Sequence, residues 1–245
     1  MEIVLAPEII THIGPLPVTN TMLVTWIVTL VLSLTAIVVG RNIKRIPSGL
    51  QNFLEFVIEF AYNLTEDLAG SRAKTFFPFI MTFFLFIITA NWFGLFPGFS
   101  TVGFHEMLNG KETFVPFLRS INSDLNTTLA LALISVIATH FYSIRFIGIV
   151  NYLKRWVSLN PIFLFVGILE FIGEFTKLVS LSFRLFGNIF AGEVVLATVS
   201  GIFAFVVPLP FYFLEIVVGF VQAAVFMMLT LVFMVLLSEV HTEEH

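Results

Sequence analysis

Residues 161–207 read PIFLFVGILEFIGEFTKLVSLSFRLFGNIFAGEVVLATVSGIFAFVV, a mostly apolar stretch with no proline after its first residue. As one α-helix with a rise of 1.5 Å per residue, this stretch would be about 70 Å long. The hydrocarbon core of a bilayer is only roughly 30 Å thick. The stretch is therefore predicted either to break near Gly187–Gly192 or to form one long, tilted helix within a membrane.

Apolar segments occupy much of the remaining chain. Because a membrane-spanning helix needs about 20 mostly apolar residues, we predict further crossings at residues 17–40, 75–98, 124–147 and 208–239. With residues 161–207 they make about five crossings in one membrane domain, residues 1–245. The segment 17–40 lacks the basic region and cleavage site of a signal peptide, so we expect it to be retained as a span.

Composition supports an integral membrane protein and excludes several other classes. The chain is 58% hydrophobic and 11% charged and contains 31 Phe, whereas soluble domains carry about 25% charged residues. The small net charge of -4 implies no nucleic-acid partner. The absence of cysteine excludes disulfides and thiolate metal sites. No Gly-rich phosphate loop, metal-binding His pair or nucleophile–base set is present, so no cofactor and no metal are expected.

Residues 47–70 differ from the predicted spans. Their apolar residues recur at helical spacing but are interrupted by Glu55, Glu59, Glu66 and Asp67. This pattern predicts an amphipathic helix lying along the membrane interface. Residues 99–123 and the basic segment NYLKRWVSLNP are expected to be loops. The predicted fold class is thus all-α integral membrane, with about five crossing helices and one interfacial amphipathic helix.

The loop charges predict the orientation by the positive-inside rule. With five crossings, eight basic residues fall on one side of the membrane: Arg41, Lys44, Arg45, Arg72, Lys74, Arg145, Lys154 and Arg155. Two basic residues, Lys111 and Arg119, fall on the other side. The N-terminus is therefore expected outside and the C-terminus in the cytoplasm.

Charged and polar residues inside the last two spans are the candidate functional groups. At 100° per residue, one arc of about 80° holds Glu170, Glu174, Lys177, Arg184 and Asn188. In the last span Glu215 and Gln222 are seven residues apart and share a face. A charge at the bilayer centre costs at least about 2.5 kcal/mol and marks function by default.

Structural alternatives exist for some of these residues. Glu170 and Lys177 could simply pair on one helix face, and Glu174 could lie at the cytoplasmic interface. Arg184 has about twenty mostly apolar residues on each side and cannot lose its proton, so it is the strongest functional candidate. His140 is close to Arg145 and is interpreted as an ordinary interfacial histidine.

Two motifs resemble the family of F-type ATP synthase subunit a, of bacterial type. SLSFRLFGNIFAGE, residues 180–193, resembles the family pattern of an arginine followed by LFGN and AGE, and QAAVFMMLT, residues 222–230, resembles a second family segment. PSGLQNFLE, SDLNTTLALAL and FYSI are weaker matches, and the resemblance runs from about residue 47 to the C-terminus. It implies one long tilted helix at residues 161–207, forming with the last helix a hairpin packed against a c-ring.

The resemblance also implies residue roles. Arg184 matches the arginine that faces the rotating c-ring, and Glu170 matches an acidic position toward the cytoplasm. Asn188, Glu193 and Gln222 match polar residues near the ion path, and Glu215 falls where members have histidine or glutamate. With Glu174 these residues make the predicted proton path.

The function implied is that of a stator subunit of the Fo sector that binds no nucleotide. It would provide two offset half-channels for protons, with Glu193 and Glu215 on the outer side and Glu170 and Glu174 on the inner side. Expected partners are the c-ring, subunit b, membrane lipid and, indirectly, the F1 sector, in the cell inner membrane; H+ is preferred to Na+. The alternative is a secondary transporter or ion channel in which Arg184 binds an anion, which predicts repeated halves and discontinuous helices. An intramembrane enzyme would need a nucleophile or metal set.

Overall fold

The computed structural model describes residues 7–41, 43–47, 49–96, 98–99, 102–108, 111–156, 161–202 and 206–239. The long helices are α1 (Asn20–Arg41), α2 (Leu50–Ala69), α3 (Ala73–Gly94), α4 (Leu125–Ile147), α6 (Pro161–Ile202) and α7 (Pro208–Ser238). The short elements are β1 (Ile9–Ile13), β2 (Leu16–Thr19), η1 (Gly70–Arg72), β3 (Gly103–Leu108), β4 (Lys111–Pro116), η2 (Ile121–Ser123) and α5 (Ile149–Trp156). Five helical segments are long and apolar enough to cross a membrane, namely α1, the α2–α3 segment, α4, α6 and α7. The prediction of an all-α membrane protein is confirmed.

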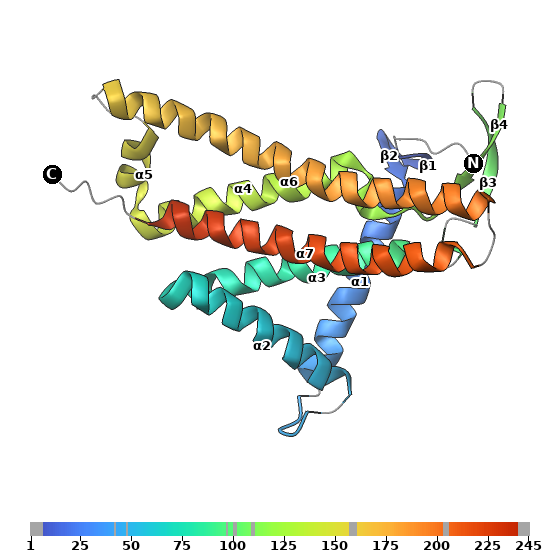
Figure 1. Ribbon diagram of the computed structural model, residues 1–245, viewed down its shortest axis with the longest axis horizontal. Coiled ribbons are helices and arrows are strands. Elements are labelled where there is room, and N and C mark those ends of the chain that lie inside the picture. Colours follow the sequence, from blue (N-terminus) through green and yellow to red (C-terminus); the bar gives the residue numbers. More distant parts are fainter. Residues whose placement is uncertain are drawn as a thin grey trace.

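Helices α3, α4, α6 and α7 pack together along the long axis of the molecule (Figure 1). Their shared core is formed by large apolar side chains such as Phe76, Ile80, Leu185, Phe226 and Met234. Hydroxyl groups add ties between helices: the Ser135 and Thr230 hydroxyls lie 2.8 Å apart between α4 and α7. Lipid is as apolar as these side chains, so close packing and hydrogen bonds between helices, rather than the hydrophobic effect, hold such a bundle together.

The bundle has two distinct ends (Figure 1). We call the end with β1–β2, β3–β4 and the α6–α7 turn the hairpin end, and the end with α5 and the end of α7 the α5 end. Helix α6 is continuous from Pro161 to Ile202 and carries no break at Gly187–Gly192; residues 203–205 of the predicted segment 161–207 lie outside the described residues. At the α5 end α6 stands apart from α7, and toward the hairpin end the two helices converge (Figure 1).

Helices α1 and α2 lie to one side of the bundle. Helix α1 starts at the hairpin end and leaves the bundle at a steep angle, and α2 leads back to the start of α3 (Figure 1). Asp124 ties the start of α1 to α4: its Oδ1 accepts from the Asn126 backbone N–H at 2.9 Å, and its Oδ2 accepts from the Thr21 hydroxyl at 2.9 Å. Helix α2 exposes Phe53 and Phe56 along with Glu59, in keeping with its amphipathic sequence.

Two segments expected to be loops contain regular structure. Within residues 99–123, β3 and β4 form an antiparallel hairpin in which Gly103 pairs with Pro116, and η2 precedes α4. The basic segment after α4 begins with α5, which is amphipathic but only two turns long. The predictions of loops here were wrong. The strand sequences GFHEML and KETFVP do not alternate polar and apolar residues, and a helix of eight residues is shorter than the length at which periodicity identifies a helix.

Candidate functional site

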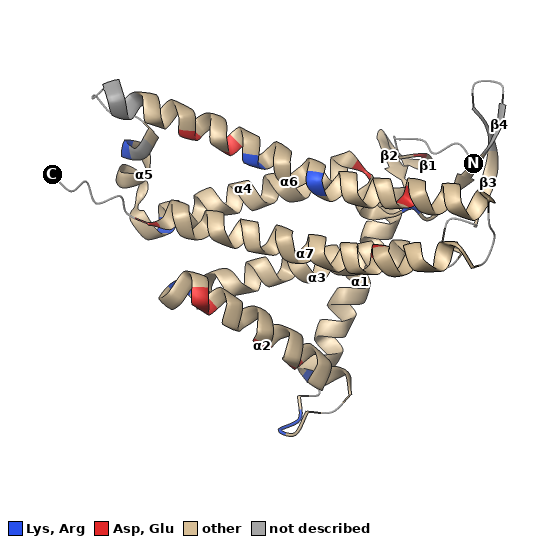
Figure 2. Ribbon diagram, in the orientation of Figure 1, with Lys and Arg blue, Asp and Glu red and all other residues tan. Residues whose placement is uncertain are grey.

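Arg184 lies near the middle of α6 on an exposed face. Its Nη2 donates to the Ser180 hydroxyl, one turn away on the same helix, at 3.4 Å. An open groove of about 400 Å³ runs beside it between α6 and α7, lined among others by Gly173, Thr176, Lys177, Ser180 and Phe233. Charged residues are sparse on α3, α4 and α7 and are spaced along α6 (Figure 2). The guanidinium therefore faces outward from the bundle, beside the groove.

One turn beyond Arg184, α6 is bonded to α7. The Asn188 side-chain amide donates to Gln222 Oε1 at 2.7 Å. Asn188 is exposed, whereas Gln222 is buried. This polar contact lies where the two helices begin to converge, between Arg184 and the carboxylates of the hairpin end.

The carboxylate of Glu215 on α7 is packed against the backbone of α6 at Gly192. A Cβ atom at Gly192 would overlap the Glu215 carboxylate. Glu215 is only 5% exposed, and its Oε1 accepts no hydrogen bond from any residue that the structure describes. The absence of a side chain at Gly192 thus creates the space in which a buried carboxylate lies.

Glu193 reaches the same region from the next position of α6. Its carboxylate hydrogen-bonds the Ser123 side chain of η2 and interacts electrostatically with Arg119 and with Glu215. Arg119 is buried, although it belongs to a segment that the sequence predicts to be a loop. Two carboxylates and one guanidinium therefore gather at the hairpin end, within a region that also buries Asn122 and Ser120.

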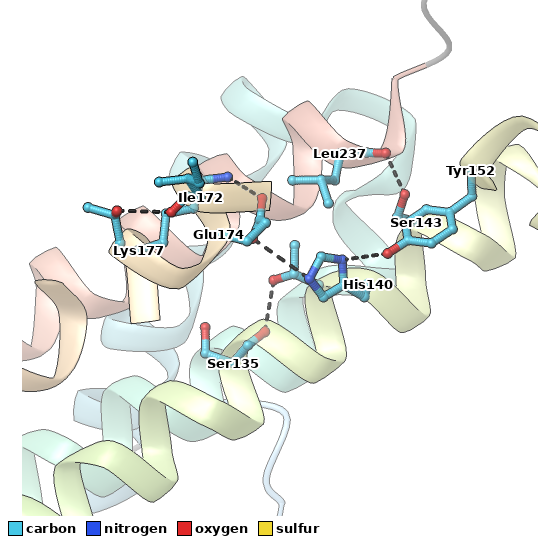
Figure 3. Close-up of polar contacts among 10 residues, drawn as sticks. Ser135, His140, Ser143, Tyr152, Ile172, Glu174, Lys177 and Leu237 are labelled. Atoms are coloured by element: carbon cyan, nitrogen blue, oxygen red, sulfur yellow. Dashed lines mark hydrogen bonds and ion pairs between the residues drawn. The ribbon is translucent and has the colours of Figure 1, made fainter. Parts of the chain in front are cut away.

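A second polar cluster lies toward the α5 end (Figure 3). Lys177 Nζ donates to Glu174 Oε1 at 2.6 Å and lies 4.6 Å from the centre of the Phe233 ring. The other carboxylate oxygen of Glu174 is 3.7 Å from His140 Nε2 on α4. The opposite ring nitrogen of His140, Nδ1, is 3.1 Å from the hydroxyl of Tyr152 on α5. Glu174 is buried, so its charge is compensated inside the protein.

The polar residues predicted to share one face of α6 contact different parts of the structure. Glu174 turns toward α4, Arg184 toward the open groove, and Asn188 toward α7. Glu170 is half-buried and acts electrostatically on His140. Lys177 pairs with Glu174, three residues away.

Sequence reasoning missed several members of these clusters. His140 was interpreted as an ordinary interfacial residue, and its contact with Glu174 depends on how α4 packs on α6. No sequence signal distinguishes Arg119 from a loop arginine, and Tyr152 lies in a segment that was also expected to be a loop. The glycine preceding Glu193 in the AGE motif is the one available hint to Gly192. Within the described ranges, no group of three or more His, Asp or Glu side chains is placed to hold a metal ion.

Comparison with known proteins agrees with the sequence motifs. The family model described as ATP synthase A chain matches residues 22–235. The ATP synthase subunit a of Moorella thermoacetica is 33% identical over 227 residues, which cover 93% of this chain and 94% of that protein. The protein of that name from Geotalea daltonii is 35% identical over 213 residues, which cover 85% of this chain and 83% of that protein. The one from Trichlorobacter lovleyi is 34% identical over 218 residues, which cover 87% of this chain and 85% of that protein. The five apolar helices and this match over most of its length identify the chain as a multi-pass membrane protein that belongs to the ATP synthase A chain family.

Proposed function

We propose that this chain is the stator subunit a of the Fo sector of a rotary ATP synthase and carries protons to and from a c-ring. The observation that carries the proposal is the position of Arg184, a permanent cation on the outward face of a membrane helix. Facing lipid, such a charge would cost several kcal/mol. A partner that presents a carboxylate at this level removes that cost, and the groove beside Arg184 offers a surface on which a partner helix can pack.

The distribution of carboxylates along α6 supports two separate proton paths. Glu193 lies about 13 Å from Arg184 along the helix in one direction, and Glu174 lies about 15 Å away in the other. A proton entering at the hairpin end passes Glu215 and Glu193 and neutralises a carboxylate on the c-ring. After the ring has turned, the proton leaves past Glu174 and Glu170 at the α5 end. Arg184 attracts the deprotonated ring carboxylate and obstructs direct passage between the two paths.

The alternative of a transporter with Arg184 as its anion site has less support. Such transporters place their sites at discontinuous helices, whereas α6 is continuous past Arg184. Binding of subunit b, an indirect connection to the F1 sector and a place in the cell inner membrane follow from the proposed role.

Replacement of Arg184 tests the proposal. Arg184→Ala should abolish ATP synthesis and ATP-driven proton pumping in membrane vesicles while the complex still assembles, because loss of a charge in mid-membrane eases insertion. Arg184→Lys keeps a charge but loses the planar guanidinium and its very high pKa, and we expect severe impairment. Arg41→Ala, at the end of α1, is the control for loss of one arginine and should couple normally. An assembled Arg184→Ala complex that still couples proton flow to synthesis would refute the proposal.

The orientation of the chain can be measured separately. We propose that the hairpin end faces outward and the C-terminus lies in the cytoplasm, as the charge count predicts. Because the chain has no cysteine, Ile46→Cys and Val102→Cys can be labelled without background; Ile46 is 85% exposed and Val102 61% exposed. In intact cells an impermeant maleimide should label Val102→Cys but not Ile46→Cys. Labelling of both from one side contradicts the five-crossing topology.

A further inference from the structure

His140 connects the buried carboxylate of α6 to the surface helix α5. Its Nε2 faces Glu174 at 3.7 Å, and its Nδ1 lies 3.1 Å from the Tyr152 hydroxyl (Figure 3). The Trp156 ring of α5 lies 6.0 Å from the imidazole, centre to centre. The side chain is 23% exposed and that of Glu174 9% exposed. The imidazole thus lies between a nearly buried carboxylate and the end of the bundle.

The charge of Glu174 does not require this histidine. Lys177 already forms a 2.6 Å ion pair with the carboxylate. His140 is therefore not needed to neutralise the charge of Glu174. Among the described residues the charged groups that act on His140 are Glu174, Lys177 and Glu170, all on α6, and Tyr152 is the titratable group that faces it from α5. Of these side-chain types, imidazole is the one whose ordinary pKa lies between 5 and 8, so it can exchange protons at neutral pH.

We propose that His140 is the proton-relay residue at the α5 end of the ion path, taking the proton from Glu174 and releasing it to water beside Tyr152. The inference rests on the proposed function and adds a residue to its inner path. In the transfer the O–H bond of the Glu174 carboxylic acid breaks as an Nε2–H bond forms, which gives a carboxylate and an imidazolium. The imidazolium then loses the proton from Nδ1 to a cytoplasmic water, and the neutral ring returns to its first tautomer through water. In ATP-driven pumping the same steps run in reverse.

Lys177 has a definite part in this relay. Its Nζ donates to Glu174 Oε1 at 2.6 Å, which leaves the other carboxylate oxygen of Glu174 facing His140 Nε2 at 3.7 Å. In the first tautomer of the relay, with the proton on Nδ1, the Tyr152 hydroxyl accepts the Nδ1–H hydrogen bond, and this contact holds the ring with Nε2 toward Glu174. Tyr152 is therefore a positioning residue, whereas His140 itself carries the proton.

The test measures voltage-driven passive proton flux in inverted vesicles stripped of the F1 sector, whose cytoplasmic face is outward. His140→Gln should lower this flux by roughly tenfold. This loss is smaller than the hundredfold or more in rate that a proton-transferring side chain typically contributes. Imidazole added to the medium should restore most of the lost flux, and an equal concentration of a bulky sulfonate buffer should not. The same additions to wild-type vesicles, and to vesicles without the complex, correct for imidazole that crosses the lipid.

Two further variants distinguish proton transfer from support of α5. Tyr152→Phe removes the hydrogen bond to the ring but leaves the imidazole, so it should lower the flux by less than His140→Gln and show no response to imidazole. His140→Asn provides a second substitution should the glutamine variant assemble poorly, with assembly measured by immunoblot of the membranes.

The outcomes separate this inference from the proposed function. Wild-type flux in assembled His140→Gln and His140→Asn vesicles, or a loss that imidazole does not restore, overturns the relay. If Arg184→Ala abolishes coupling in vesicles that retain the F1 sector, the proposed function stands and only the role of His140 is rejected. If Arg184→Ala couples normally, the proposed function fails whatever His140 does.

Discussion

The two halves of the α6–α7 pair surround the carboxylates of Glu174 on α6 and Glu215 on α7 in different ways. Toward the α5 end, Glu174 is bonded to Lys177 and faces His140, so its charge is compensated by neighbours. Toward the hairpin end, Glu215 Oε1 and the Asn122 Oδ1 atom are buried without a hydrogen-bond partner in the described part of the chain. Buried polar atoms are almost always satisfied by protein or by ordered water. The difference concerns the carboxylates alone, because Trp156 Nε1 and Ser238 Oγ near the α5 end are also buried without a partner among the described residues.

Helix convergence explains part of this contrast. At the hairpin end α6 and α7 approach so closely that Gly192 leaves room for the Glu215 carboxylate and for little else on that side. At the α5 end α6 stands away from α7 (Figure 1), and the partners of Glu174 are Lys177 of α6 and His140 of α4. The side chains of one continuous helix thus lie in two different environments, because the helices that pack against α6 change along its length.

The largest effect expected from the hairpin-end half is on proton flux. Glu215→Leu and Glu193→Leu should each slow ATP-driven pumping by about a hundredfold, the cost typical of removing an acid–base group. Glu215→Gln keeps the shape of the side chain but cannot take up a proton, so it should be as slow as Glu215→Leu. Pumping is measured by quenching of a pH-sensitive dye in vesicles. Glu59→Gln, on an exposed carboxylate of α2, is the control and should pump normally.

Normal pumping in the assembled leucine variants would remove Glu193 and Glu215 from the proton path. A slow Glu215→Leu variant with a normal Glu215→Gln variant would mean that the carboxylate acts only through its shape and hydrogen bonds. In that case the contrast between the two halves of the α6–α7 pair would be one of packing.

The close approach at Gly192 gives a smaller and mainly structural effect. Gly192→Ala places a methyl group on the Glu215 carboxylate, and overpacking of this kind costs about 1–3 kcal/mol. Gly201→Ala, on the same helix, meets no atom within 4 Å and should not destabilise the chain. Thermal unfolding of the purified complex in detergent measures the difference. Equal stability of the two variants would show that Glu215 can leave its place without cost.

The helices and the central arginine could be predicted from the sequence because membrane insertion makes strict demands. About 20 apolar residues are needed for each crossing, and an arginine such as Arg184 among them has few explanations other than function. Both signals are local. The resemblance at SLSFRLFGNIFAGE then identified the family, which the comparisons confirm.

The partners of the polar residues could not be predicted because they depend on packing between helices. His140 and Glu174 meet across α4 and α6, and Arg119 reaches Glu193 from a segment with no periodic pattern. Helical spacing showed that Glu174 and Arg184 share a face, but the divergence of α6 from α7 decides which neighbour each one meets. The roles proposed for these side chains remain predictions for the experiments above.

The smallest predicted effect concerns the contact that divides the two halves, the hydrogen bond from Asn188 to Gln222. Hydrogen bonds between membrane helices have an average coupling energy of about 0.6 kcal/mol, because the separated helices find other partners. The single variants Asn188→Ala and Gln222→Ala and the double variant should therefore show a coupling of that size in the thermal stability of the complex. Proton pumping should fall further in Gln222→Ala than in Asn188→Ala if the buried amide also borders the proton path proposed at the hairpin end, because Gln222 is the buried member of the pair. Strictly additive stabilities would mean that the 2.7 Å contact does not join α6 to α7, and the two halves would then be separated by Arg184 alone.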